Sequence, residues 1–481
     1  MKTNYHVVII GGGAGGLATA ETLLGHGLDI LLIDENNHTG GQLLRKVERQ
    51  SSWNPLVNFD PDQMKQKGFG LVERVLGADN GIETINRTQV LGIADGRRIV
   101  VEQAKAGRPS KESQNQMFEV QAEHIVLATG VRERYLPFQG WTLPGVMSLG
   151  AAQILMKSHG VLPGASTLIG GSSPLMMVLA AEILKNRGKV LALLDENGFQ
   201  EKARFFPHVK DHWPKLMEGA WYSAKMMLHR TPLRQNQRII EALGSGRLQS
   251  VVAAKTDPAG NVIPGTEQTY STDTLAVGYG FVPNIELAVQ AGCDVRYLKE
   301  KGGWIVKVDE MLETSIPSLY AVGEITGVAG AKKSLVEGKL AAMSILEKMD
   351  LAGSSSKDDA FQQEKQKLVT LDQQQQDYAS FLGQFCELPM EAYKSIPDAT
   401  IICRCENITM GAVRKAVEAG FDTLIGLKKA TRCTMGRCQG RICGAVITDI
   451  ITALTEKSAQ EVGVPGARMP VKNVELGSFV Q

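Results

Sequence analysis

The sequence lacks several features that would place it in other broad classes of protein. It has 52 basic and 51 acidic residues, so no charge excess points to nucleic acid or to an anionic membrane surface. No run of about 18 apolar residues exists, so no transmembrane helix is predicted. The first apolar segment starts about five residues from the N-terminus, which leaves no room for a signal peptide. We expect a cytoplasmic protein whose contact with the inner membrane is at most peripheral.

Cysteine is scarce over most of the chain. Seven are present, and five of them lie between Cys403 and Cys443. In a cytosolic chain such clustering favours a metal site over disulfides. Cys293 and Cys386 are isolated, and we predict that they are structural. The eight histidines are scattered and form no catalytic motif with a carboxylate or an arginine, so no catalytic residue is predicted.

Glycine, by contrast, is abundant, with 51 residues, and the most informative ones follow the first apolar run. Residues 7–10 are an apolar run of the β type, residues 17–25 have a helical pattern, and residues 30–33 form a second apolar run. This order predicts a βαβ unit whose first turn carries G-x-G-x-x-G, at residues 11–16. The length of 481 residues allows about three such domains.

Each glycine of this turn has a predicted role in holding a dinucleotide. Gly11 allows the tight turn, Gly13 leaves room for a pyrophosphate, and Gly16 lets the helix pack closely on the strand. The free N–H groups at the helix start point at the phosphate charge. Asp34 lies 23 residues after Gly11, where an acid can bond a ribose hydroxyl.

Three further segments carry the signatures of one superfamily. Residues 124–130 are an apolar strand ending in Ala-Thr-Gly, residues 133–146 follow it, and residues 314–324 end in Gly-Glu. With the glycine turn, they make the chain resemble the FAD-dependent pyridine-nucleotide–disulfide oxidoreductase superfamily. In that superfamily the acid after the last glycine binds the ribityl chain of the flavin. The usual residue is Asp, and here it is Glu324.

This resemblance implies an α/β fold with two dinucleotide-binding, Rossmann-like domains, the second inserted in the first. The N–H groups at the start of a helix over residues 331–346 should then face the flavin. The cofactor-binding residues that it implies are Gly11, Gly13, Ala14, Gly15, Gly16, Asp34, Glu35, Gly41, Gln42, Ala128, Thr129, Gly130, Gly323 and Glu324.

A second βαβ pattern begins at residue 166, but its glycine turn is degraded. Ser172 or Ser173 stands where the second glycine is expected, and a side chain there crowds a pyrophosphate. Loss of NAD(P) binding, or binding of a mononucleotide such as ATP, is therefore favoured. Residues 205–229 form a helix-rich insertion whose aromatic and Met residues we interpret as a core or interface patch.

The predicted domain limits follow from these patterns. The FAD-binding domain is split, and the other units lie within and after it. They comprise an FAD-binding domain at 1–155 and 275–350, a degenerate NAD(P)-binding-like domain at 156–274, a helical linker at 351–395, and a small, mostly helical [2Fe–2S] domain with its tail at 396–481.

The clustered cysteines have the spacing C-x-C-x27-C-x4-C, from Cys403 and Cys405 to Cys433 and Cys438. Zinc sites usually use C-x2-C, so C-x-C is an unusual bite for zinc. A [2Fe–2S] cluster needs four thiolates. The pattern resembles the bacterioferritin-associated ferredoxin-like domain, which implies these four cysteines as the ligands. Cys443 is expected inside the following helix, as a packing residue.

The cationic residues around these cysteines could offset the negative charge of such a cluster, as could helix-start N–H groups near Cys438. The cations are Arg404, Arg432 and Arg437. No cysteine lies around residues 40–41 or 129–144, which excludes a redox-active dithiol from the usual places beside a flavin.

The core and the cysteine module together resemble the α (A-type) subunit of heteromeric amino-acid and opine dehydrogenases. That group includes octopine and nopaline oxidases, hydroxyproline and proline dehydrogenases, and hydrogen cyanide synthase. The resemblance implies a subunit of an FAD-dependent oxidoreductase that uses CH–NH or CH–NH2 donors. It passes electrons from a glycine-oxidase-like β subunit, which holds the substrate-oxidising FAD, to an external acceptor; a small third subunit fits the same resemblance.

Several alternatives stay open at this stage. FMN at a subunit interface, or ATP, could occupy a nucleotide site in place of FAD. The chain could be a self-contained NAD(P)H-dependent flavin oxidoreductase that feeds its own cluster. It could also be a non-catalytic, redox-sensing subunit.

Overall fold

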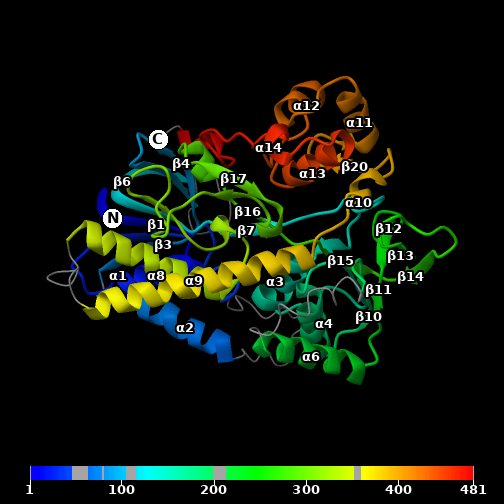
Figure 1. Ribbon diagram of the computed structural model, residues 1–481, viewed down its shortest axis with the longest axis horizontal. Coiled ribbons are helices and arrows are strands. Elements are labelled where there is room, and N and C mark those ends of the chain that lie inside the picture. The colour runs from blue at the N-terminus through cyan, green and yellow to red at the C-terminus, as the bar shows by residue number, and fades with distance from the viewer. Residues whose placement is uncertain are drawn as a thin grey trace.

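The computed structural model describes residues 2–45, 63–77, 81–104, 115–198, 213–350 and 359–479. Two sheets with their helices form the two ends of the molecule, and a small helical unit lies against one side of them (Figure 1). No helix within these ranges is both long enough and apolar enough to cross a membrane. The mixed α/β fold class with a helical C-terminal region is confirmed.

The first sheet carries the glycine turn. Its order is β3-β2-β1-β6-β5-β4, with β19 added on β6. The central strands are parallel, whereas β5 runs antiparallel to both of its neighbours, β4 and β6. The strands are β1 (Asn4–Ile10), β2 (Ile30–Ile33), β3 (Ile82–Ile85), β4 (Thr88–Ala94), β5 (Arg98–Gln103), β6 (Gln116–Leu127) and β19 (Leu319–Ala321).

The register of this sheet brings three chain segments to one edge. Ile10 of β1 lies opposite Ile33 of β2 on one side and Leu127 of β6 on the other. Because these strands are parallel, the residues that follow them leave the sheet together at its carboxyl edge. Ligands of doubly wound folds bind at this edge.

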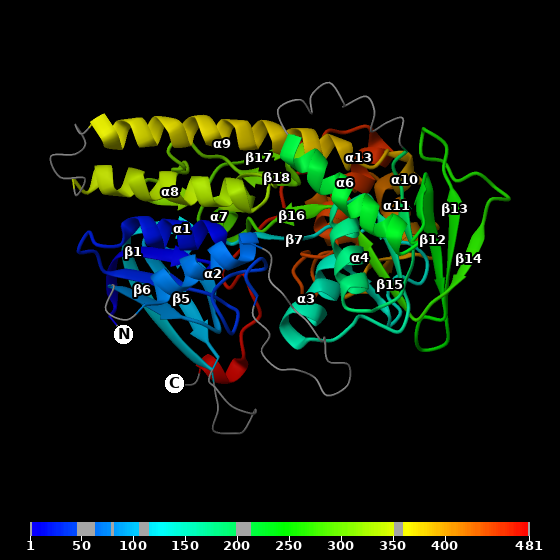
Figure 2. The ribbon, with the colours of Figure 1, turned by 90° about the horizontal axis from the view of Figure 1, so that it is seen from below.

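Helices cover the first sheet in two layers. Helix α1 (Ala14–Leu23) packs on α8 (Ala331–Lys348), where a Cβ on Gly338 would lie 2.3 Å from the Gly15 carbonyl oxygen. Helix α9 (Asp359–Phe385) lies on the outer side of α8 in both views (Figures 1 and 2). The segment predicted as a linker is therefore mostly one helix of 27 residues.

The second sheet has the order β11-β10-β9-β15-β8 and is all parallel. It includes β8 and β15, which the sequence analysis assigned to the first domain. An apolar run alone does not show which sheet a strand joins. The strands are β8 (Val146–Ser148), β9 (Thr167–Gly171), β10 (Val190–Asp195), β11 (Leu233–Gln235) and β15 (Thr274–Gly278), and the helices are α3 (Leu149–His159), α4 (Leu175–Lys185) and α6 (Trp213–Leu228).

Smaller elements connect and flank the two sheets. The predicted insertion at residues 205–229 becomes α6 where it is described, while residues 199–212 lie outside the described ranges. The remaining elements here are β7 (Val131–Glu133) paired with β16 (Phe281–Pro283), β17 (Val295–Leu298) paired with β18 (Gly303–Val306), the sheet of β12 (Gln237–Leu243), β13 (Ser250–Lys255) and β14 (Gln268–Ser271), α2 (Gln63–Leu76), α7 (Glu286–Gln290), and the short helices Lys299–Lys301 and Gly323–Thr326.

The C-terminal unit is a group of short helices beside one small hairpin. Helix α12 within it was not predicted from the sequence. The elements are α10 (Glu391–Lys394), β20 (Ile401–Cys403), β21 (Ile408–Thr409), α11 (Met410–Glu418), α12 (Leu424–Thr431), α13 (Gly444–Thr455), α14 (Ala459–Val462) and the short helix Leu476–Phe479.

Buried polar contacts fasten this unit to the rest of the chain. Arg134, which follows β7, forms an ion pair with Asp449 of α13, and the two side chains are 10% and 3% exposed. Tyr297 of β17 also donates to Asp449, at 3.2 Å. The Trp141 indole donates to the Ile401 carbonyl oxygen at 2.7 Å. The C-terminal unit is thus attached through charge as well as apolar packing.

We expect Arg134→Ala to destabilise the protein strongly. The substitution leaves the Asp449 carboxylate buried without its cation, which costs about 3–5 kcal/mol. Lys457→Ala is the control, because Lys457 and Asp422 form an ion pair whose side chains are 34% and 28% exposed. Its loss should cost about 1 kcal/mol or less. Urea unfolding followed by circular dichroism measures both, and equal midpoints for the two variants would contradict the anchoring role of Arg134.

Candidate nucleotide site and cysteine centre

The glycine turn has the close backbone approaches that the motif predicts. Gly11 has φ +112°, and a Cβ there would lie 2.3 Å from the Ala128 carbonyl oxygen. A Cβ on Gly16 would lie 2.0 Å from the Gly11 carbonyl oxygen. A Cβ on Gly13 would instead meet only the Gly41 Cα, at 4.0 Å, so the backbone there is open to a ligand. This is the cradle that a pyrophosphate requires.

The start of α1 completes the phosphate end of this site. The helix begins at Ala14, and its N-cap residue, Gly13, offers no side-chain hydrogen bond to the first turn. No acidic side chain lies in that first turn. The first N–H groups of α1 are therefore left for an anion, and the helix dipole favours one there.

Asp34 lies directly beside the turn. Its Oδ2 accepts from the Gly12 N–H at 2.8 Å, and its Oδ1 accepts from the backbone and side chain of Asn36 at 2.8 and 2.7 Å. The carboxylate thus shapes the glycine turn in addition to its predicted contact with ribose. Glu35, the next residue, forms an ion pair with Lys472, a partner that the sequence analysis did not find.

The second glycine pair closes the other side of the turn. The Gly40 N–H donates to the Gly12 carbonyl oxygen at 2.8 Å, and a Cβ on Gly41 would lie 2.8 Å from the Gly13 Cα. Gln42 has its side-chain oxygen bonded to Arg45, at 2.9 Å. Gly41 therefore packs directly against the glycine turn, while the Gln42 side chain is hydrogen-bonded to Arg45.

The Ala-Thr-Gly segment follows β6 and is tied to a distant loop. The Thr129 hydroxyl donates to the Asn284 carbonyl oxygen at 2.7 Å, and the Asn284 amide donates to the Thr129 carbonyl oxygen at 2.9 Å. The Asn284 N–H also bonds to Gly130, at 3.0 Å. Arg132 then binds the Asn284 side chain at 2.8 Å and pairs with Glu286 at 2.7 Å.

Residues after β19 form a buried charged network at the same edge. Glu324 accepts from the backbone N–H groups of Gly330 and Ala329, at 2.6 and 3.3 Å, so its ribityl-binding role stays a prediction. Lys333 and Glu337, both 1% exposed or less, form an ion pair at 2.8 Å. Glu337 also accepts from the Gly323 N–H, at 2.6 Å. Burial raises the pKa of Glu337 to about 7, although Lys333 opposes that shift.

The second glycine turn differs from the first at the positions where a nucleotide would bind. The side-chain oxygen of Ser173 accepts from the Leu175 N–H at 3.3 Å, and Ser172 is buried. Glu196, which follows β10, is paired with buried Arg238 at 2.9 Å. The charge of the Glu196 carboxylate is therefore already balanced by Arg238. Whether this domain binds NAD(P) stays a prediction.

Five cysteines converge in the C-terminal unit. The Sγ atoms of Cys403, Cys433 and Cys443 lie within 4.8 Å of one another, and all three residues are buried. Cys405 and Cys438 lie side by side: burial, together with a hydrogen bond to Cys438, raises the pKa of Cys405. Hydrogen bonds from Cys433 and Cys443 lower the pKa of Cys403 to about 2, against the effect of burial. Such a thiolate is the form that binds a metal.

Cys443 lies elsewhere than the sequence analysis expected. It is the N-cap residue of α13, not a residue inside the helix, because the helix begins at Gly444. The helix-start N–H groups of α13 therefore follow Cys443 directly. The backbone between the two cysteines folds as turns, with Arg441 donating to the Cys438 carbonyl oxygen at 3.3 Å.

The predicted cations are arranged unevenly around the cysteines. Arg432 pairs with Glu406 at 3.0 Å, and the Arg404 guanidinium lies 5.4 Å from the centre of the Trp141 ring. Arg437 is exposed. Offsetting of a cluster's charge by these three residues stays a prediction.

The segment after Ala-Thr-Gly and the cysteine loop are joined by two arginines. Arg132, beside the Ala-Thr-Gly segment, donates from Nε to the Arg441 carbonyl oxygen at 2.8 Å. Arg441 lies between Cys438 and Cys443 and is 4.0 Å from Glu286, the partner of Arg132. The two candidate sites therefore share one polar junction.

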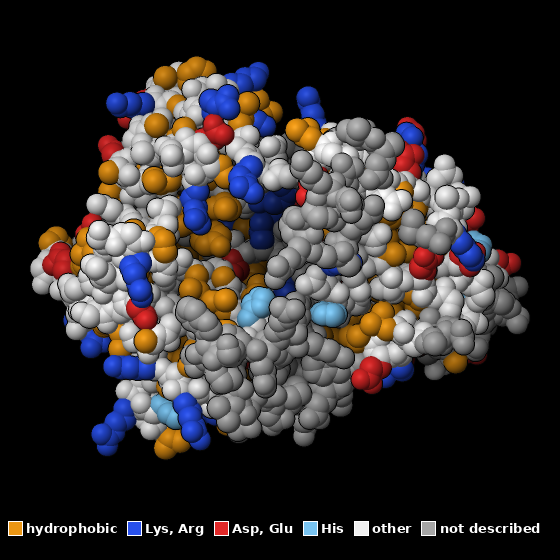
Figure 3. All heavy atoms as spheres, turned by 180° about the vertical axis from the view of Figure 1, so that it is seen from behind, with side chains coloured by type: hydrophobic (Ala, Val, Ile, Leu, Met, Phe, Trp, Pro, Cys, Tyr) orange, Lys and Arg blue, Asp and Glu red, His pale blue; other side chains and the backbone are white. Residues whose placement is uncertain are grey.

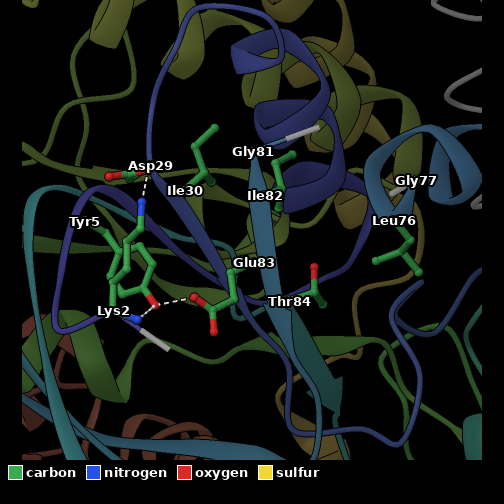
Figure 4. Close-up of a pocket in the computed structure, with 10 residues that line it drawn as sticks. All are labelled: Lys2, Tyr5, Asp29, Ile30, Leu76, Gly77, Gly81, Ile82, Glu83 and Thr84. Atoms are coloured by element: carbon green, nitrogen blue, oxygen red, sulfur yellow. Dashed lines mark hydrogen bonds and ion pairs between the residues drawn. The ribbon is translucent and has the colours of Figure 1, made fainter. Parts of the chain in front are cut away.

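The surface of the described chain has two notable hollows. The face opposite Figure 1 is hollowed near its centre, where Lys and Arg side chains gather (Figure 3). A cavity of about 480 Å³ lies at the amino end of the first sheet, where Tyr5 donates to Glu83 at 2.6 Å and Lys2 pairs with Asp29 (Figure 4). It lies at the opposite end of β1 from the glycine turn, so it is separate from the nucleotide site.

A Rossmann-type turn at the carboxyl edge of a parallel sheet defines the class: a dinucleotide-binding oxidoreductase fold. Comparison with known families agrees, because residues 5–345 match the pyridine nucleotide-disulphide oxidoreductase family. The chain belongs to that family, whose domain implies FAD. Residues 398–480 match the sarcosine oxidase A3 domain.

Individual relatives extend this likeness over nearly the whole chain. The chain is 28% identical to hydrogen cyanide synthase subunit HcnB of Pseudomonas aeruginosa, over 99% of this chain and 98% of the relative. It is 29% identical to an opine oxidase subunit of Agrobacterium tumefaciens, over 99% and 91%. The crystal structure of L-proline dehydrogenase from P. horikoshii is similar in fold, with a TM-score of 0.66 and 20% identity over 99% of this chain and 80% of that one. These relatives confirm the predicted resemblance.

Replacement of Gly13 tests the cradle. Gly13→Ala adds a Cβ that meets no protein atom closer than 4.0 Å, so thermal stability should be unchanged. The same Cβ fills the space of the pyrophosphate, and overpacking of this kind costs about 1–3 kcal/mol. We expect FAD to bind about 5- to 150-fold more weakly in a titration followed by flavin fluorescence.

Gly466→Ala is the matched control, since a Cβ there meets nothing within 4 Å and Gly466 lies outside the turn. It should leave both stability and FAD affinity as they are. Equal FAD affinity in the Gly13→Ala variant and the native chain would show that this turn does not hold the pyrophosphate.

Replacement of single cysteines tests the metal centre. We expect Cys433→Ala to lower the iron content of the purified chain strongly, because Cys433 is a predicted ligand. Cys443→Ala should lower it less, because the Cys443 thiol lies within 4.8 Å of the Cys403 sulfur but is not one of the four predicted ligands. Cys386→Ala is the control, since Cys386 is distant in sequence from the cysteine loops. Iron and sulfide analysis measures the result. Full iron content in the Cys443→Ala variant would support the packing role that the sequence predicts for Cys443.

Proposed function

We propose that this chain is the electron-transferring subunit of a heteromeric flavoenzyme that oxidises the C–N bond of an amino acid or an opine. The carrying observation is the hydrogen bond from Arg132, just after the Ala-Thr-Gly segment, to the carbonyl oxygen of Arg441, which lies in the loop between Cys438 and Cys443. A chain that held a nucleotide for structural reasons alone would not need this arrangement.

The residues present suit FAD in the first domain. Gly11 and Gly16 make the close turn, the open face at Gly13 admits a diphosphate, and α1 directs its first N–H groups to it. Asp34 keeps the turn in place through the Gly12 N–H. FMN at a subunit interface, and ATP in place of FAD, remain the alternative occupants, since ATP and FAD share an adenine nucleotide half.

The cysteine centre suits a [2Fe–2S] cluster, which takes four thiolates. We propose Cys403, Cys405, Cys433 and Cys438 as ligands, with Cys443 as a fifth thiol that competes for one of these positions. Hydrogen bonds from the backbone N–H groups of Thr434 and Glu406 help to keep Cys403 ionised. Bound together, a flavin accepts an electron pair and an iron–sulfur centre accepts single electrons, so the two convert a two-electron oxidation into one-electron steps.

The substrate site is proposed to lie on a partner. Several relatives are named as subunits of hydrogen cyanide synthase, opine oxidase and sarcosine oxidase, which indicates that chains of this kind work in heteromers. The partner that we propose is a catalytic, FAD-containing, glycine-oxidase-like β subunit, with a small third subunit in the same complex. Electrons then leave the complex to an external acceptor.

A self-contained NAD(P)H oxidoreductase is the second candidate. It requires nicotinamide to bind at the second glycine turn, where the Ser173 hydroxyl accepts from the Leu175 N–H and Arg238 is paired with Glu196. These contacts favour the relay over the reductase. A redox-sensing role requires a cluster that no flavin of the complex reduces. The anaerobic experiment with NADH and substrate therefore also distinguishes this role from the relay.

We expect NADH to leave the purified chain's flavin oxidised under anaerobic conditions. In a complex with the β subunit, an amino-acid or opine substrate should bleach the flavin and produce the electron paramagnetic resonance signal of a reduced cluster. A complex with Cys403→Ser should keep the bleaching but lose the signal and the transfer to an external dye. Rapid bleaching by NADH alone would contradict the relay, and a silent cluster after full bleaching would point to the sensor.

A further inference from the structure

The C-terminal tail leaves the cysteine unit and returns to the first sheet. After α14 it crosses the molecule, and its end lies near β4 in Figure 1 and near β5 in Figure 2. The Val471 N–H donates to the Leu91 carbonyl oxygen of β4 at 2.8 Å. Ser478, which is 4% exposed, donates to Glu102 of β5 at 2.7 Å. The tail is therefore packed on the sheet and held there by backbone and side-chain hydrogen bonds.

This path brings one cation to the ribose end of the nucleotide site. The Lys472 ammonium forms an ion pair with Glu35, and its side chain is 31% exposed. Burial lowers the pKa of Lys472, while the nearby Asp34 carboxylate counteracts this shift. The ammonium therefore lies within electrostatic range of both acids that follow β2.

The position of Lys472 is fixed from two sides. Arg441 of the cysteine loop donates to the carbonyl oxygen of Val471, the residue before Lys472. On the other side, the Gln89 side chain of β4 donates to the carbonyl oxygen of Asn473, the residue after it, at 2.8 Å. The backbone on both sides of Lys472 is thus held by hydrogen bonds. The Lys472 side chain is therefore directed toward Glu35 and loses little conformational entropy when the ion pair forms.

The charges at this end of the site explain why a cation is needed. Asp34 and Glu35 put two carboxylates at the predicted ribose end of the site, and their charge repels an anionic diphosphate held at the glycine turn. Asp34 is partly satisfied by the Gly12 N–H and Asn36, but Glu35 has Lys472 as its ion-pair partner. A lysine that offsets these acids therefore raises the affinity of the site for any nucleotide carrying a diphosphate.

We propose that Lys472 is a nucleotide-binding residue, supplied by the C-terminal tail, that offsets Asp34 and Glu35 and strengthens binding of the ADP half of a dinucleotide. The inference rests on the proposed nucleotide site in the first domain. The nucleotide site is then formed by residues within the first 130 positions together with the C-terminal tail.

The test compares a substitution of Lys472 that removes its charge with one that keeps it. The full-length chain, freed of nucleotide, is titrated by calorimetry with FAD and, separately, with ADP. Lys472→Ala should weaken both ligands by about 3- to 10-fold at low salt, and by less as salt rises. Lys472→Arg keeps the charge and should bind both ligands as the native chain does.

Equal weakening by Lys472→Ala and Lys472→Arg would overturn the inference, because the charge of Lys472 would then not be the cause. Unchanged affinity in Lys472→Ala would overturn it too, as would a loss of affinity that does not shrink as salt rises. Lys457→Ala, a lysine of the same unit paired with Asp422, should have no effect. If Lys472→Ala does not fold, Lys472→Gln, which keeps a long polar side chain without the charge, carries the same expectation. A native chain that binds neither FAD nor ADP would instead refute the proposed nucleotide site itself.

Discussion

The close contact of the Gly16 position with the Gly11 carbonyl oxygen is the constraint on which the rest of the site depends. A Cβ at Gly16 would come within 2.0 Å of that oxygen, so only glycine lets α1 start directly above β1. From this contact follow the direction of the first N–H groups and the place of Asp34, which holds the Gly12 N–H. Helix α8 can then approach α1 at Gly15 and Gly338, which brings the charged network of Lys333 and Glu337 to the same edge.

The cysteine centre is built into this frame more closely than a separate ferredoxin-like module would be. Arg134 and Asp449 fix α13, Trp141 bonds to the strand that carries Cys403, and Arg132 holds the loop between Cys438 and Cys443. These contacts come from the segment that directly follows the Ala-Thr-Gly turn. The proposed relay therefore needs no mobile domain, because its two centres share the residues that position them.

Local patterns made much of the fold predictable, and non-local contacts explain the rest. The βαβ unit at residues 4–33 was predictable because its strand, glycine turn and acid are close in sequence. The pairing of β15 with β9 was not predictable, since an apolar run does not show which strand will pair with it. Cys443 was misplaced because the helix start depends on turns after Cys438, and Lys472 was missed because no motif links residues 437 positions apart.

The position of β19 on β6 has a consequence for how the chain acquires its shape. Ala321 pairs with Leu127, nearly 200 residues earlier, so the first sheet is incomplete until the inserted second domain has been made. Contacts of such separation are formed late and slow the search for the native state. The tail that reaches Glu35 is made later still. During synthesis the second sheet can form first, while the amino-terminal strands still have their apolar faces exposed. Chaperones or an early-bound partner would protect these strands at that stage.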